Sequence, residues 1–100
     1  MKLVRDKIPN IIKESNKTCE YHIASEDEYK IRLYEKMVEE LEEFIENPSL
    51  EEAADIYEVL SSMCALHSIH MTHVTYATLV KRKQRGGFEG AIVLERVSES

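Results

Sequence analysis

The chain has 100 residues, of which 43% are hydrophobic and 32% are charged, and its formal net charge is −6 at pH 7. We expect one domain over residues 1–100, with a small core that self-association would help to complete. The negative charge argues against nucleic-acid binding, and no apolar run approaches the roughly 18 residues that cross a bilayer. A disordered acidic tail and a membrane protein are therefore excluded.

The first residues are charged where a secretory signal peptide would become apolar. These positions are occupied by Lys2, Arg5, Asp6 and Lys7. We therefore expect no secretory signal and a cytoplasmic location. Cys19 and Cys64 lie far apart and have no CxxC spacing, so we expect both thiols to be reduced.

Acidic residues are concentrated in the centre of the chain. Residues 35–58 contain ten acidic side chains and one basic side chain, a net charge of −9, which leaves +3 for the remainder. The basic clusters on either side consist of Lys2, Arg5, Lys7 and Lys13, and of Lys81, Arg82, Lys83 and Arg85. This distribution suits a metal ion that holds a phosphorylated ligand. A pair of helices with ordinary surface charges is the alternative.

The first half of the chain predicts two helices and a short strand. A short helix extends over about Pro9–Ser15, because proline is tolerated in a first turn. Residues 18–23 include β-favouring types and are predicted as a strand. Ser25 followed by Glu28 is a capping box, which predicts a long helix that ends near Asn47.

The second half predicts two more helices and a second strand. After a tight break at residues 47–49, Ser49 is the predicted N-cap of a third helix that ends near His67. A fourth helix is predicted from Thr72 to the glycine pair at 86–87, where glycine can take the left-handed cap conformation. Residues 91–97 are predicted as a strand that could pair with the first, although two short strands alone are marginal. The predicted fold class is all-α, with four bundle-forming helices and a small two-stranded β appendage.

The two central helices each carry an apolar stripe at helical spacing. In the second helix the stripe consists of Ile31, Tyr34, Met37, Val38, Leu41, Phe44 and Ile45. In the third helix it consists of Ala53, Ile56, Tyr57, Val59, Leu60, Met63 and Cys64. We expect both stripes to face a core.

Carboxylates interrupt this pattern at one level of the predicted helical hairpin. At about 100° per residue, Glu52 falls inside the apolar arc of the third helix and Asp55 falls at its edge. Glu40 and Glu43 lie together on one side of the stripe of the second helix. Because the chain turns near residues 47–48, we expect Glu43 opposite Glu52 and Glu40 opposite Asp55.

Four carboxylates that meet without a base would repel one another, and charges aimed at a core are unfavourable unless they are paired or bind a cation. Oxygen-only ligation suits Mg²⁺, with Mn²⁺ as the alternative. The competing interpretation is that glutamates are common on helices. Glu52 is also the third residue after Ser49, where a capping box would use it. The mirrored arrangement of two acidic pairs favours the metal site.

The acidic elements and both ends of the chain resemble a known family. Residues 39–43 read Glu-Glu-Leu-Glu-Glu and match an EExxE element, and residues 52–55 read Glu-Ala-Ala-Asp and match ExxD. Together they resemble the MazG-like, all-α nucleoside triphosphate pyrophosphohydrolases. The opening residues 2–9 and the late residues 85–88 are similar to a subgroup related to phosphoribosyl-ATP pyrophosphohydrolase. The resemblance covers essentially the whole chain.

The resemblance implies magnesium-dependent hydrolysis of a nucleotide between its α- and β-phosphates, with release of a monophosphate and pyrophosphate. The implied metal ligands are Glu40, Glu43, Glu52 and Asp55. Glu39 would be an accessory acid that orients water, so Glu39, Glu40 and Glu43 form the implied catalytic set. The family also implies a homodimer or homotetramer and a house-cleaning role on non-standard or excess nucleoside triphosphates.

Two other functions remain open. One is a phosphoribosyl-ATP-type substrate, and the other is a catalytically silent helical oligomer that binds a nucleotide or a protein partner. The silent alternative is disfavoured because all four carboxylates are present, and a decayed site would be expected to have lost one.

Basic residues are the candidates for phosphate contacts. Lys81 and Arg85 lie four positions apart on one helical face, and Arg5 and Lys7 lie near the start of the chain. The alternative for Lys81 and Arg85 is that cations simply favour a helix C-terminus.

Two further residue sets have competing interpretations. The set Cys64, His67, His70 and His73 suggests zinc, but a repeated spacing of three drifts about 60° per step and crosses the predicted helix break, which favours neutral histidines. The aromatic residues Tyr29, Tyr34, Tyr57, Tyr76 and Phe88 could stack on a base, with packing as the alternative.

Overall fold

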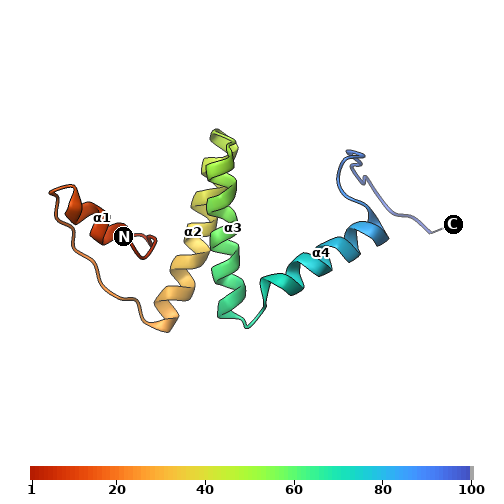
Figure 1. The fold of residues 1–100 in the computed structure, drawn as a ribbon. Coiled ribbons are helices and arrows are strands. Elements are labelled where there is room, and N and C mark those ends of the chain that lie inside the picture. The colour runs from red at the N-terminus through yellow and green to blue at the C-terminus, as the bar shows by residue number, and fades with distance from the viewer. Residues whose placement is uncertain (100) are drawn as a thin grey trace. The chain divides into compact units, whose positions relative to one another are not determined.

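The computed structural model describes residues 1–99. Its helices are α1 (Ile8–Glu14), α2 (Glu26–Glu46), α3 (Leu50–Leu66) and α4 (Met71–Arg85), as Figure 1 shows. The prediction of an all-α chain with four helices is therefore confirmed for the described residues. The chain divides into two compact units, Met1–Ile69 and His70–Ser100, which are described separately below. The single domain over residues 1–100 stays a prediction.

The ends of α2 and α3 follow from their capping residues. The Ser25 hydroxyl accepts a 3.2 Å hydrogen bond from the Glu28 amide, and the Ser49 hydroxyl accepts a 3.1 Å bond from the Glu52 amide. Both bonds satisfy amides that the first helical turn leaves without a backbone partner. The short connection through residues 47–49 turns α3 back along α2, and the two helices pack as an antiparallel hairpin (Figure 1).

The expected β appendage is absent from the described chain. Residues 18–23 and 91–97 have no regular secondary structure. Two short segments with few side chains to pack gain too little from a backbone ladder to form a stable sheet by themselves. That part of the predicted fold class was wrong for residues 1–99.

The side of α2 that is buried differs from the predicted one. Leu33 and Glu40 are the buried residues of α2, and Val59 is the buried residue of α3. The predicted stripe is largely exposed: Val38 is 55% and Ile45 75% accessible. At about 100° per residue, the centre of this stripe lies roughly 115° around α2 from Glu40. Because α2 cannot turn both sides toward α3, burial of Glu40 leaves the stripe outside.

The second unit begins with α4 and continues into an irregular segment. Gly86 follows α4 with a φ of 84°, a left-handed value that glycine adopts without a steric penalty. The start at Met71 and the stop before Gly86 agree with the sequence prediction to about one residue. No residue of this unit is buried within the described chain, and Phe88 is 99% exposed.

None of the helices within residues 1–99 is long and apolar enough to span a membrane.

Candidate metal and nucleotide site

Three of the predicted carboxylates converge on one point of the α2–α3 hairpin. One oxygen each from Glu40, Glu52 and Asp55 lies within 4.8 Å of the other two. Glu40 comes from α2, and the other two residues lie one helical turn apart on α3. The helical hairpin therefore places carboxylates from both helices at the same level, as the numbering around the turn predicts.

The cluster contains buried oxygens that no group of the described chain satisfies. Glu40 is only 5% exposed, and its Oε2 atom has no hydrogen-bond partner. The Oε2 atom of Glu52 is likewise buried without a partner. Burial raises the pKa of Glu40 most, the nearby charges of Glu43 and Asp55 add to it, and Lys36 opposes the rise. Buried carboxylate oxygens without hydrogen-bond partners favour the binding of a positively charged ligand.

The capping box does not account for the Glu52 side chain. The Ser49 hydroxyl caps the helix through the Glu52 amide. The side-chain hydrogen bond between these two residues within residues 1–99 is this one, and the Oε2 atom of Glu52 has no partner. The Glu52 carboxylate is therefore available to a ligand.

Two cations of the chain partly neutralise the cluster. Arg5 Nη2 donates a 2.8 Å hydrogen bond to Asp55 Oδ1, which raises the pKa of Arg5. Lys36 Nζ lies 3.2 Å from Glu40 Oε1 and 3.4 Å from Glu39 Oε2. Burial disfavours the charged form of Lys36, but the hydrogen bond to Glu40 and the charges of both glutamates outweigh it and raise the pKa of Lys36.

Glu39 lies beside the cluster rather than within it. Its carboxylate pairs with Lys36 and, at 3.7 Å, with Lys2 of the N-terminal segment. Its side chain is 32% exposed, so water can reach it. This position is compatible with the predicted accessory role, which stays a prediction.

Glu43 is near the cluster but outside the group of three. It is exposed on α2, although its charge contributes to the raised pKa of Glu40. A step of three residues rotates a side chain by about 60° around the helix axis, and Glu43 is rotated away from the buried line through Leu33 and Glu40. One oxygen of Glu40 lies within 4.8 Å of an oxygen of each α3 carboxylate, and the expected pairing of Glu43 with Glu52 stays a prediction.

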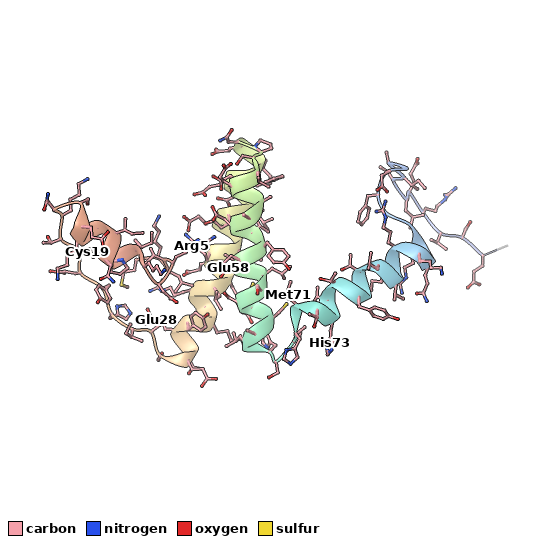
Figure 2. All side chains as sticks on the ribbon, viewed as in Figure 1. Arg5, Cys19, Glu28, Glu58, Met71 and His73 are labelled. Carbon is pink, nitrogen blue, oxygen red and sulfur yellow. The ribbon has the colours of Figure 1, made fainter. Side chains whose placement is uncertain are left out.

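A cavity of about 540 Å³ opens beside the carboxylates, between the N-terminal segment, α1, α2 and α3. Its charged walls are formed by Arg5, Asp6, Lys7, Lys36, Glu40, Asp55 and Glu58. Figure 2 shows Arg5 and Glu58 close together where the N-terminal segment meets the hairpin, in agreement with the attraction between their charges. Acidic and basic groups thus share one concave site.

The four predicted phosphate contacts fall into both units. Arg5 and Lys7 line the cavity, and their role as phosphate contacts stays a prediction. Lys81 and Arg85 are exposed on α4, which belongs to the other unit, and their role stays a prediction.

Sequence reasoning overlooked Lys36, Glu58 and the position of Tyr29, all of which line the cavity. A signal for Lys36 was present, because it is the only base in the acidic stretch of residues 35–58. Tyr29 and Lys36 lie seven positions apart, as do Leu33 and Glu40, so all four share one side of α2. That side is marked by polar residues rather than by the apolar stripe.

Within residues 1–99, His67, His70 and His73 belong to no converging group of three or more possible metal ligands. His67 Nε2 lies 3.3 Å from the Tyr34 hydroxyl. The rings of His70 and His73 are 5.6 Å apart in an edge-to-face arrangement at the start of α4, where Figure 2 labels His73. The possible metal-ligand group found in the described part of the chain is the acidic one, and the interpretation of the histidines stays a prediction.

No family model, curated protein or solved structure matches this chain. The assignment to the MazG-like family therefore depends on the sequence motifs and stays a proposal.

Proposed function

We propose that this chain is a MazG-like, magnesium-dependent nucleotide pyrophosphohydrolase. It cleaves a nucleoside triphosphate between the α- and β-phosphates into a monophosphate and pyrophosphate, in a house-cleaning role in the cytoplasm. The observation that carries the proposal is the convergence of Glu40, Glu52 and Asp55, with two buried oxygens that lack partners. The adjoining cavity of about 540 Å³ lies within the size range of small-molecule sites.

The donor set fits the proposed metal. Carboxylate oxygens are the ligands that Mg²⁺ and Mn²⁺ prefer, and Mg²⁺ is commonly held by few carboxylates together with substrate phosphates. Glu40, Glu52 and Asp55 would hold the ion. Glu43 lies less than one turn further along α2 and is the proposed fourth ligand. The unsatisfied Oε2 atoms of Glu40 and Glu52 support this assignment because a cation would satisfy both.

The residues around the carboxylates suit the charge changes of the reaction. When bound, the metal would polarise phosphate oxygens and lower the pKa of a water molecule. Glu39 would orient that water, a role supported by its 32% side-chain exposure and by Lys36, which pairs with both Glu39 and Glu40. Lys7 and Lys36 face the cavity and would meet the charge that develops on the phosphates. Arg5 would join them after releasing Asp55.

We also propose that the chain functions as a homodimer or homotetramer. The exposed stripe on α2 includes Val38 and Ile45, and on α3 Tyr57 is 56% and Leu60 36% accessible. At about 100° per residue, Tyr57 and Leu60 lie roughly 160° and 100° around α3 from Val59, away from the cavity lining. Because α2 and α3 are antiparallel, these rotations bring both stripes to one side of the hairpin. A second copy that covers this side would complete a four-helix bundle.

One observation favours a second candidate, a helical oligomer that binds a nucleotide without turnover. Arg5 and Lys36 supply two positive charges to the carboxylates from within the chain. If these two ion pairs are permanent, the cluster needs no metal. The two candidates differ in whether a divalent cation displaces Arg5.

The experiment that tests the proposed function is product analysis on a panel of ribo- and deoxyribonucleoside triphosphates, including modified bases, with and without Mg²⁺. The proposal predicts monophosphate and pyrophosphate in equal amounts, only when Mg²⁺ is present. Release of orthophosphate would identify a different bond. Nucleotide binding without any product would support the second candidate.

A further inference from the structure

The cavity changes in chemical character along the hairpin. On α2 its lining consists of Tyr29, Leu33, Lys36 and Glu40. At about 1.5 Å per residue, Tyr29 lies roughly 16 Å along the helix from Glu40. The order from one end to the other is therefore aromatic, aliphatic, cationic and anionic.

The α3 wall repeats this order in the antiparallel direction. Asp55 lines the cavity at the level of Glu40, Glu58 and Val59 line it near the level of Lys36, and Ser62 lines it further along, toward Tyr29. The N-terminal segment and α1 contribute the remaining wall, with the apolar side chains of Leu3, Val4, Ile8 and Ile11 and the charged side chains of Arg5, Asp6 and Lys7. On α2 and α3, away from the carboxylates, the polar side-chain groups of the lining are the hydroxyls of Tyr29 and Ser62.

The direction of this gradient matches the polarity of a nucleotide. Phosphates require the metal and the cations, whereas a base offers a flat, mainly apolar face. A base at the carboxylate end would be desolvated against charges, and phosphates at the other end would meet aliphatic side chains. One orientation is therefore strongly favoured.

We propose that Tyr29, Leu33, Val59 and Ser62 form the base subsite, which binds a flat, uncharged ring by stacking and apolar contact. This inference rests on the proposed function, since that function places the phosphates at the carboxylates. Two hydroxyls can each donate and accept, so they do not fix one pattern of donors and acceptors on the base edge. The subsite accepts the common bases with similar affinity and gains affinity when a base carries an added methyl group.

The experiment uses the full chain, α,β-methylene nucleoside triphosphates of the four common bases, and tripolyphosphate as a probe without a base. Affinities are measured by calorimetry in the presence of Mg²⁺. The variants are Tyr29→Leu, which keeps an apolar helix-forming side chain, and Tyr29→Phe, which keeps the ring. Tyr76→Leu is the matched control, because Tyr76 is an exposed tyrosine on α4. Circular dichroism checks that each variant is folded.

We expect the four analogues to bind the unmodified chain within about tenfold of one another. Tyr29→Leu weakens all four by roughly tenfold, the effect of losing one base–aromatic stack, and leaves tripolyphosphate unchanged. Tyr29→Phe and Tyr76→Leu retain the original affinities. A 5-methylcytosine analogue binds about three- to fourfold more tightly than its cytosine counterpart, as burial of one methyl group predicts.

Three results would overturn the subsite: unchanged nucleotide affinity in Tyr29→Leu, parallel loss of tripolyphosphate binding in that variant, or weaker binding of the methylated base. The two proposals can fail separately. Hydrolysis that does not respond to Tyr29→Leu refutes the subsite alone. If the analogues bind in a way that depends on Tyr29 but natural nucleotides are not hydrolysed, the proposed reaction is refuted and the subsite is not.

Discussion

The guanidinium of Arg5 donates a 2.8 Å hydrogen bond to Oδ1 of Asp55, fifty positions away in the sequence. Asp55 is at the same time one of the three residues whose oxygens form the acidic cluster. A metal at this cluster and the Arg5 side chain therefore compete for one carboxylate. This competition connects the N-terminal segment to the site. Its effect on the affinity for a metal ion can be measured.

Replacement of Arg5 by glutamine should separate metal binding from substrate binding. Arg5→Gln removes the competing cation, so we expect Mg²⁺ to bind more tightly by a few fold, since a partly exposed ion pair contributes little energy. The KM for a nucleotide should rise, because a phosphate contact is lost. Calorimetry with Mg²⁺ and steady-state kinetics measure the two effects. Lys13→Gln, on α1 and outside the cavity lining, is the control. A weaker affinity for Mg²⁺ in Arg5→Gln would contradict the competition.

Neutral substitutions at the α3 carboxylates should abolish hydrolysis without unfolding the chain. Glu52→Gln and Asp55→Asn should each lower kcat by more than roughly a hundredfold, because both remove a proposed metal ligand. Glu52→Gln should keep or increase the metal-free melting temperature, since it removes a buried carboxylate oxygen without a partner. Loss of folding with normal specific activity in the folded fraction would contradict the metal assignment.

The raised pKa of Glu40 predicts a pH dependence of metal-free stability. The ordinary pKa is 4.5 and the folded value is higher, so the folded chain binds this proton more tightly than the unfolded chain does. The stabilisation is fully present below the ordinary pKa and is lost as the pH rises through the folded value. In the presence of a chelator, Glu40→Gln should therefore be less sensitive to pH in this window and more stable than the parent above it. Urea denaturation at several pH values measures both, and identical profiles for the two proteins would refute the prediction.

A charge in the exposed stripe of α2 should prevent self-association. Val38 is 55% exposed in the single chain and lies on the side of α2 away from Glu40. Val38→Asp would place a charge in an apolar interface, so we expect a monomer by sedimentation equilibrium at concentrations where the parent chain is oligomeric. Glu46→Lys, an exposed change near the end of α2, should leave the oligomer intact. A monomeric parent chain, or oligomeric Val38→Asp, would refute the proposed interface.

The helices and part of the cluster could be predicted from the sequence because local rules determine them. Ser25 and Ser49 satisfy the first amides of α2 and α3, and the break between these helices sets their antiparallel register. The register alone places Glu40 level with Asp55. Whether Glu43 joins the other carboxylates depends in addition on the rotation of α2 about its axis. The hydrophobic periodicity did not predict this rotation correctly.

The missed features depend on contacts between distant segments. The periodicity of α2 identifies an apolar stripe but does not tell whether α3 or a second copy of the chain covers it. The position of Arg5 against Asp55 depends on how residues 1–7 pack against the hairpin. Lys36 could equally have been read as a surface partner of Glu40 at the i,i+4 spacing. Its 18% side-chain exposure is a property of the folded site.

Electron paramagnetic resonance with Mn²⁺ can establish whether the buried carboxylates bind a divalent cation. The proteins compared are the parent chain, Glu52→Gln and Glu51→Gln. Glu51 is the exposed neighbour of Glu52, so the control makes the same chemical change in the same helical turn. We expect the parent chain and Glu51→Gln to bind Mn²⁺, Mg²⁺ to displace it, and Glu52→Gln not to bind it. Equal binding by all three proteins, or binding by none, would refute the metal site at these carboxylates.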